Sequence, residues 1–202
     1  MSTVFLTGAS GFLGGHLLHE LVGAGHSVRA LSRSEGSDAA IIALGGQPMR
    51  ASLDDADSLA AALAGCEAVF HAAADTSMWK RNAARQTATN VDGTRRLLAA
   101  AERAGVSAFL HTSSVSAYSH LVHGTMAETT PQRGGESWVN YERSKYLAEQ
   151  SVRGSALPWI VFNPSYILGP GDRHNWARLI RLIAAQKLPG IPPGTGAFAG
   201  VR

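Results

Sequence analysis

A tyrosine and a lysine stand four residues apart in the stretch VNYERSK, residues 139–145. The stretch predicts a helix, and Tyr141 and Lys145 would share one of its faces because positions four apart are neighbours. A phenol with a pKa of about 10 is a poor acid–base group at neutral pH, but a nearby positive charge lowers that value. The pair is therefore either an ordinary surface pair or a proton donor with the cation that tunes it, and the spacing alone leaves both interpretations open.

A glycine-rich segment, TGASGFLG at residues 7–14, follows an apolar run and opens a helical pattern. Gly8 permits a tight turn, Gly11 permits close approach of the backbone to a diphosphate, and Gly14 permits close packing of the helix. Free N–H groups and the dipole at a helix N-terminus favour an anion. In this strand–turn–helix context, the segment predicts a nucleotide-binding loop.

Apolar runs alternate with helix-period segments along the chain. This repeated alternation predicts an α/β fold, a doubly wound parallel sheet of the Rossmann type with helices on both faces. Such sheets bind ligands at the carboxyl ends of their strands, near the point where the strand order reverses. Strands are expected at 4–7, 27–32, 48–52, 68–74, 107–114 and 158–164. Helices are expected at 11–22, 39–44, 54–63, 89–104, around Tyr141 and at 175–187, followed by a loop over 188–202.

The composition restricts the class of protein. Hydrophobic residues make up 45% of the 202 residues and charged residues 16%, which is typical of a globular chain. The net charge is +3, but the basic residues are dispersed, which argues against nucleic acid as a partner. Cys66 is the single cysteine, the N-terminus lacks a basic signal region, and prolines interrupt the longest uncharged run, 156–171. We therefore expect a cytoplasmic protein with a small-molecule substrate, no membrane span and no bound metal.

The end of the second predicted strand indicates which cofactor the loop would hold. A site that prefers NAD usually places an acid here to bind the ribose hydroxyls. This chain has Ser32 at that position and Arg33 after it. A carboxylate would repel a 2′-phosphate, whereas an arginine binds it through charge-assisted hydrogen bonds. The sequence therefore predicts NADP(H) in preference to NAD(H).

Six short motifs in this order resemble the extended short-chain dehydrogenases/reductases. They are TGASGFLG at 7–14, FHAAA at 70–74, NVDGT at 90–94, HTSS at 111–114, YERSK at 141–145 and FNP at 162–164. That family includes nucleotide-sugar epimerases and dehydratases, and reductases similar to dihydroflavonol reductase. The resemblance covers nearly the whole chain.

The resemblance implies a set of residues that hold the cofactor. Small side chains at 72–74 would line its ribose side, and Asn90 would lie near the active site or support the backbone. The family usually has an Asp–hydrophobic pair at the end of the third strand, where this chain has Ser52 and Leu53, so the contact with adenine would differ. The cofactor-binding residues expected are Gly8, Ser10, Gly11, Phe12, Leu13, Arg33, Ser52, Leu53, Ala72, Ala73, Ala74, Asn90, Thr112, Tyr141, Lys145 and Phe162.

The resemblance also implies a catalytic role for Ser114, Tyr141 and Lys145. Tyr141 would give a proton to a carbonyl oxygen during reduction and take it back during oxidation. Lys145 would lower the pKa of the phenol and bind the cofactor ribose, and Ser114 would orient the substrate oxygen. Ser113 is the neighbouring alternative to Ser114.

The resemblance divides the chain into an NAD(P)-binding domain over 1–165 and the start of a substrate-binding region over 166–202. The family normally continues further, so we expect the C-terminal substrate lobe to be largely absent, either because the chain is truncated or because it is a naturally short member. Two alternatives to a reductase stay open: a nucleotide-sugar epimerase that oxidises its substrate transiently, and a binding protein that senses the cofactor without catalysis. Val115 and Ser116 follow Ser114 where a sugar dehydratase would have Asp-Glu. By analogy, a homodimer would form through the helices at 89–104 and 141–153.

Overall fold

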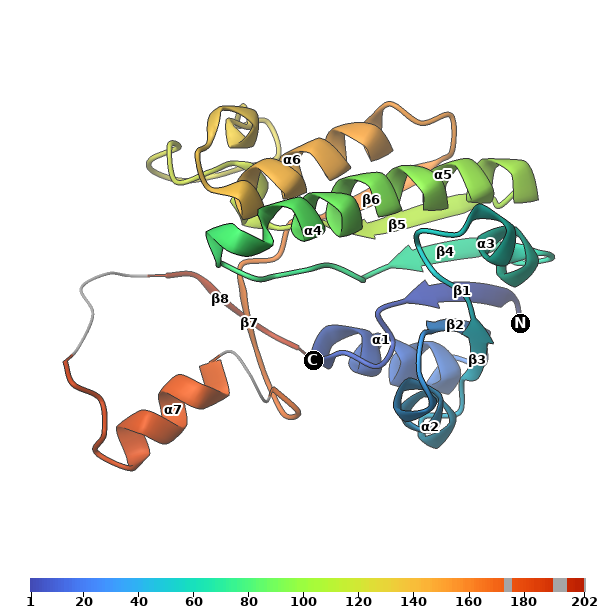
Figure 1. Ribbon diagram of the computed structural model, residues 1–202, viewed down its shortest axis with the longest axis horizontal. Helices are drawn as coiled ribbons and strands as arrows, with labels where there is room; N and C mark the ends of the chain where they lie inside the picture. The colour runs from blue at the N-terminus through green and yellow to red at the C-terminus, as the bar shows by residue number, and fades with distance from the viewer. Residues whose placement is uncertain (173–175, 191–195, 202) are drawn as a thin grey trace.

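A computed structural model describes residues 1–172, 176–190 and 196–201. Its centre is a sheet of six parallel strands in the order β3-β2-β1-β4-β5-β6 (Figure 1). This confirms the predicted doubly wound parallel sheet. The strands are β1 (Thr3–Thr7), β2 (Ser27–Ser32), β3 (Gln47–Arg50), β4 (Ala68–His71), β5 (Ala108–Thr112) and β6 (Trp159–Phe162).

Helices cover both faces of the sheet. The longer helices are α1 (Phe12–Gly23), α2 (Glu35–Ala43), α3 (Ala56–Leu63), α5 (Gly93–Ala104), α6 (Asn140–Arg153) and α7 (Trp176–Ala184), with a short α4 (Ala83–Thr87) before α5. Figure 1 shows α1 and α2 on one face and α3, α5 and α6 on the other. The chain moves outward in one direction from β1 to β3 and in the other direction from β4 to β6. Because the crossover connections are right-handed, the helices that connect the strands of the two halves lie on opposite faces of the sheet. The strand order reverses between β1 and β4, which opens a crevice at their carboxyl ends.

Side chains along β1 point alternately to the two faces of the sheet, so this strand contributes to both hydrophobic cores. Phe5 packs with Leu63, Leu97 and other residues in the layer that contains α3 and α5. Its neighbours Val4 and Leu6 point the other way, toward the layer that contains α1 and α2. Because every β1 side chain in these layers is buried, the strand appears in the sequence as a continuous apolar run. Among the described residues, no helix is long and apolar enough to cross a lipid bilayer.

The starts of two helices differ from the prediction by four residues or more. α2 begins at Glu35 instead of residue 39, because Ser34 caps the helix by accepting a hydrogen bond from the Ser37 N–H at 3.2 Å. The helix expected at 89–104 starts earlier, since α4 and a π-helical turn (Ala88–Asp92) precede α5. Both misses arise because polar residues at a helix start obscure the apolar periodicity.

The C-terminal segment contains a strand where the sequence predicted a loop. β8 (Phe198–Gly200) pairs in parallel with β7 (Tyr166–Leu168), so that Tyr166 lies opposite Phe198. The two strands form a separate small sheet beside the carboxyl ends of the main sheet (Figure 1). The helix predicted at 175–187 is α7, and residue 175 lies outside the described residues.

Candidate active site

The glycine-rich loop connects β1 to α1 and has the backbone that an anion site requires. Gly8 has a φ of +80°, which favours glycine, and the Gly11 N–H donates to the Gly8 carbonyl at 2.9 Å. An added Cβ at Gly8 would lie 2.8 Å from the Ala73 nitrogen, so the tip of β1 touches the segment after β4. The N-cap of α1 is Gly11, which has no side chain to occupy the first N–H groups, and the first turn carries no acid. These N–H groups are therefore available to a negatively charged ligand.

The loop forms part of the wall of a cavity of about 540 Å³ at the carboxyl ends of the strands. Half of the sixteen residues predicted to bind a cofactor line this cavity. They are Gly8, Ser10, Gly11, Arg33, Leu53 and 72–74. Asp75 and Arg85 also line it, and they form an ion pair at 2.9 Å that the sequence analysis missed.

The other predicted cofactor residues lie outside the wall of this cavity. Phe12 and Leu13 occupy the first turn of α1 and are half-buried. Ser52 lines a second, smaller cavity. Asn90 is buried in the π-helical turn, and Thr112 and Phe162 pair at the ends of β5 and β6.

Ser114, Tyr141 and Lys145 come together beside the end of β5 and do not line the cavity. Lys145 lies in α6, is buried, and donates from Nζ to the Thr112 carbonyl at 3.0 Å. Burial lowers the pKa of its ammonium to about 8, and the carboxylate of Glu149 opposes that change. Thr112 thus contributes a backbone carbonyl that positions the lysine.

The phenol of Tyr141 differs from the expectation. Its burial raises the pKa, and the hydrogen bond with the Ser114 hydroxyl offsets only part of that rise. We expected Lys145 to lower the pKa of the phenol, but desolvation of the phenolate has the largest effect on it. The hydrogen bond nevertheless brings together Ser114, which follows β5, and Tyr141 of α6, two residues that the sequence analysis assigned to one catalytic site.

A hydrogen-bonded chain connects the cavity to α6. The Asp75 N–H donates to Asn90 Oδ1 at 2.7 Å, and Asn90 Nδ2 donates to Ser144 Oγ at 3.0 Å. Ser144 Oγ then donates to the carbonyl of Tyr141 at 2.8 Å. Asn90 therefore supports the backbone on both sides, and the loop after β4 and the helix that carries Tyr141 are held in one register.

Glu149, one turn beyond Lys145, is fully buried and ties the same region together. Its Oε2 accepts a hydrogen bond from Asn163 Nδ2 at 2.8 Å, and the same amide nitrogen donates to the Ser114 carbonyl at 3.1 Å. The segment that carries Ser114 is thereby anchored to α6. The sequence analysis missed Glu149, although its position four residues after Lys145 on the same helical face was a visible signal.

His71 forms a second buried chain behind the glycine-rich loop. Thr94 Oγ1 donates to the Asn90 carbonyl at 2.6 Å, so it accepts from His71 Nε2 at 2.9 Å. In a neutral ring that carries this proton, Nδ1 is an acceptor, so the Thr7 hydroxyl, which accepts from the Ala73 N–H at 3.2 Å, donates to Nδ1 at 2.7 Å. Each donor therefore has one acceptor only if His71 is neutral with its proton on Nε2. His71 is thus a buried residue of β4.

Acid should destabilise the protein through its two buried imidazoles. Burial, with a smaller contribution from Lys145, lowers the pKa of His71 to about 3, and burial beside His71 lowers that of His111 well below its usual range. Both are neutral when folded and protonate near pH 6.5 when unfolded, so stability should fall as pH drops below about 6.5 toward 3. For each histidine the loss approaches about 1.4 kcal/mol per pH unit.

Urea unfolding at pH 7, 6 and 5 measures this loss. In the variant His71→Asn, the unfolding free energy should decline less steeply with falling pH, by up to about 1.4 kcal/mol per pH unit. In His19→Gln, at an exposed position of α1, it should decline as in the parent. An unfolding free energy that stays constant from pH 7 to pH 5 would contradict the assignment of neutral, buried imidazoles.

Comparison with known proteins relates this geometry to a family. A sequence profile of the NAD dependent epimerase/dehydratase family matches residues 4–198. The chain is 35% identical, over 94% of its length, to 4-hydroxy-2-methyl-3-oxo-4-farnesyl-3,4-dihydroquinoline-1-oxide ketoreductase of Stigmatella aurantiaca. It is 35% identical over 99% of its length to sterol demethylase protein B of Methylococcus capsulatus, and 33% identical over 87% to 2-alkyl-3-oxoalkanoate reductase of Stenotrophomonas maltophilia.

Solved structures agree with the sequence comparisons. The crystal structure of gox2253 superimposes with a TM-score of 0.84 at 36% identity, over 94% of this chain and 59% of that one. A short-chain dehydrogenase/reductase superfamily protein from Agrobacterium tumefaciens with bound NAD has a TM-score of 0.70 at 29% identity, over 82% of this chain and 50% of that one. The chain spans 54% to 62% of the length of the three curated relatives named above.

Proposed function

The chain belongs to the NAD-dependent epimerase/dehydratase family, and we propose that it transfers hydride between a nicotinamide cofactor and the carbon of a carbonyl or secondary alcohol. Tyr141 is the general acid and base of this reaction. The observation that carries the proposal is the contact of Ser114 with Tyr141, one helical turn from the buried Lys145, at the sheet edge where the glycine-rich loop opens.

The residues of the cavity fit a dinucleotide. The first turn of α1 would hold the diphosphate, because no side chain caps its N–H groups and no acid stands in it, and Gly11 has no side chain to keep a ligand from the backbone. Ala72 and Ala73 line the cavity and would lie along the ribose, and their backbone leaves no room for a side chain at Gly8. When bound, such a cofactor supplies or accepts the hydride.

The protein's own residues move the proton. During reduction, Tyr141 Oη gives its proton to the carbonyl oxygen as that oxygen gains charge, which yields a neutral alcohol. During oxidation, the phenolate takes the proton from the alcohol. The Ser114 hydroxyl orients the substrate oxygen, and the Lys145 ammonium stabilises the phenolate that reduction leaves behind.

The division of the chain follows the two sheets. We propose that residues 1–165 form the cofactor domain and that 166–202 begin the region that contacts substrate. The six-stranded sheet ends at Phe162 and the small sheet begins at Tyr166, which supports a boundary between them.

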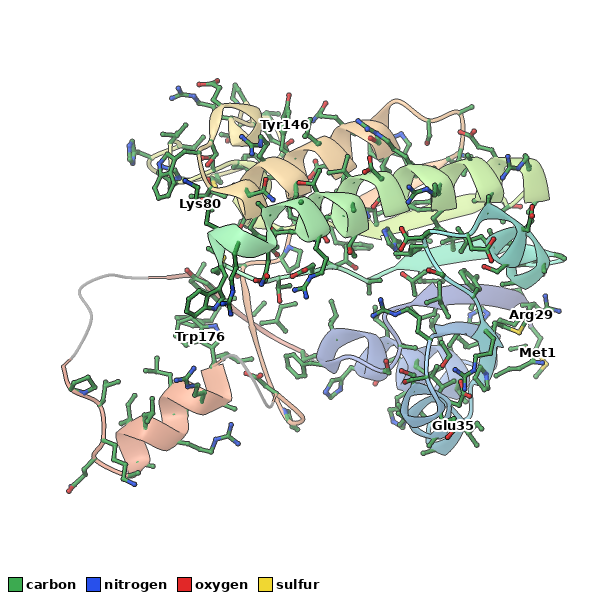
Figure 2. The ribbon with its side chains drawn as sticks, in the orientation of Figure 1. Met1, Arg29, Glu35, Lys80, Tyr146 and Trp176 are labelled. Carbon is green, nitrogen blue, oxygen red and sulfur yellow. The ribbon has the colours of Figure 1, made fainter. Side chains whose placement is uncertain are left out.

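An apolar substrate body suits the second region. Tyr166, Trp176 and Phe198 form a cluster with ring centroids 4.9 to 5.5 Å apart, and Tyr166 and Phe198 are about half exposed. Figure 2 shows Trp176 against β7 and β8, beside the carboxyl ends of the main sheet. The names of relatives with farnesyl, sterol and alkyl substrates support the same inference. Assay of NADPH consumption with apolar and polar ketones, beside chromatography of UDP-sugars for an epimerised product, tests it, and turnover of UDP-sugars alone would reject it.

Cofactor selection should depend on Arg33. Arg33 lines the cavity where the adenosine ribose would lie and forms no ion pair with any residue in the described part of the chain. We expect NADPH to bind about tenfold more tightly than NADH, and Arg33→Ala to remove most of this difference by weakening NADPH alone. Fluorescence titration with both cofactors measures it. Equal or tighter binding of NADH by the parent protein would reject the preference for NADP(H).

The epimerase alternative makes a different prediction. An epimerase returns the hydride to its own substrate and keeps its cofactor, so the protein would copurify with tightly held dinucleotide. A reductase would bind NADPH reversibly and release NADP with each turnover. Relatives at 33% to 35% identity carry reductase names, which favours the second outcome. A cofactor-sensing protein without catalysis would bind NADPH but would not consume it with any of the carbonyl compounds.

A further inference from the structure

A second cavity, of about 390 Å³, adjoins the 540 Å³ cavity, called the dinucleotide groove below, at the end where the adenosine would lie. The two cavities share Arg33 as a common wall residue. The second one opens between the carboxyl ends of β2 and β3 and the start of α3, where Ser52 and Ser58 add hydroxyl groups. A ligand that fills the groove would therefore place any group attached to its adenosine ribose near this cavity.

Arg50 brings a second guanidinium group into the same cavity. It is the last residue of β3 and pairs in the sheet with Ser32, the residue before Arg33. Asp38 of α2 accepts a hydrogen bond from Arg50 Nη2 at 2.6 Å. This ion pair uses one side of the guanidinium and fixes its position, and the side chain stays half exposed to the cavity and solvent.

The cavity offers a hydroxyl donor, and its carboxylate is engaged by the N-terminus of a helix. Asp55, the one carboxylate in the wall among the described residues, caps α3 by accepting hydrogen bonds from the N–H groups of Asp57 and Ser58. Ser52 Oγ accepts from the Asp54 N–H at 3.2 Å, so the hydrogen of that hydroxyl can donate to a ligand. Two guanidinium groups and a hydroxyl donor together match a phosphate monoester, which arginine binds through paired hydrogen bonds.

We propose that Arg50 and Arg33 jointly bind the phosphate on the adenosine ribose, so that this second cavity selects 2′-phosphorylated dinucleotides. Asp38 is the positioning residue that holds Arg50 in place. The inference rests on the proposed binding of NADP(H) in the groove. It assigns a role to a β3 residue that the sequence analysis passed over.

Calorimetric titration with two small probes tests the proposal without any activity assay. The probes are 2′,5′-ADP, which carries the ribose phosphate, and ADP, which lacks it. The parent protein should bind 2′,5′-ADP more tightly. In Arg50→Ala, affinity for 2′,5′-ADP should fall by about tenfold or more, while affinity for ADP changes by less than about twofold. Arg50→Lys should fall between the two, since lysine keeps the charge and loses the paired geometry.

Arg96→Ala is the matched control, because Arg96 also forms an exposed ion pair, with Asp54 at 3.0 Å, and does not line the cavity. It should bind both probes as the parent does. Unchanged affinity of Arg50→Ala for 2′,5′-ADP, with Arg33→Ala still sensitive, would overturn this inference alone. An equal loss of affinity for both probes in Arg50→Ala would also overturn it. So would a thermal melt that shows Arg50→Ala to be unfolded. A parent protein with no preference for 2′,5′-ADP would overturn the choice of NADP(H) itself.

Discussion

Replacement of Tyr141 by phenylalanine should lower the rate of carbonyl reduction by about a thousandfold or more. The phenylalanine ring keeps the packing of α6 but has no proton to give to the carbonyl oxygen. Affinity for NADPH should stay within about twofold, because the phenol acts on the substrate oxygen and its loss leaves the glycine-rich loop intact. Single-turnover reduction, measured beside NADPH titration, separates the two effects.

Tyr146→Phe is the matched control on the same helix. Its ring packs against Gly135, so this variant should retain the parent rate. Activity retained in Tyr141→Phe, or an equal loss in both variants, would remove the proton-transfer role from Tyr141.

Replacement of Gly14 by alanine should cost about 3 kcal/mol or more in unfolding free energy, and cofactor binding should be lost with it. An added Cβ would lie 2.0 Å from the Gly8 carbonyl oxygen and 2.5 Å from the Gly8 carbonyl carbon. Both are backbone atoms of the turn that would hold the diphosphate, so they cannot move aside without opening the loop. Urea unfolding and NADPH titration measure the two losses.

Gly15→Ala provides a control one residue further along α1. There the nearest atom to an added Cβ is 3.6 Å away, an ordinary contact, and alanine is favoured over glycine within a helix by up to about 1 kcal/mol. This variant should be neutral or slightly stabilised and should bind the cofactor normally. If both substitutions had the same effect, close packing of α1 against the Gly8 turn would not explain the glycine at 14.

Parallel strands buried on both sides explain why the fold was predictable. VFLT and SVRALS appear in the sequence as apolar runs, and β1 and β2 match them closely. The glycine-rich loop was equally visible, because its φ requirement at Gly8 and its contact with Ala73 demand glycine. Local sequence thus predicts the structure where the backbone conformation or the burial of a single segment determines which residue types it can contain.

Features that depend on several distant elements were not predictable. Asp75 and Arg85 pair across ten residues in a wall that only the folded chain creates. β8 is too short and too rich in small residues to resemble a strand until it pairs with β7. The pKa of Tyr141 depends on how deeply α6 buries it, which the spacing to Lys145 does not reveal.

The central claim is that Tyr141 and the glycine-rich loop serve one reaction, although Tyr141 does not line the cavity that the loop opens onto. A crystal structure with NADP and a carbonyl or alcohol ligand tests this most directly. The account predicts the diphosphate at the N-terminus of α1 and the substrate oxygen in contact with both Tyr141 Oη and Ser114 Oγ, facing the nicotinamide ring. A dinucleotide whose nicotinamide ring points away from Tyr141, with the substrate oxygen bound elsewhere, would contradict the account.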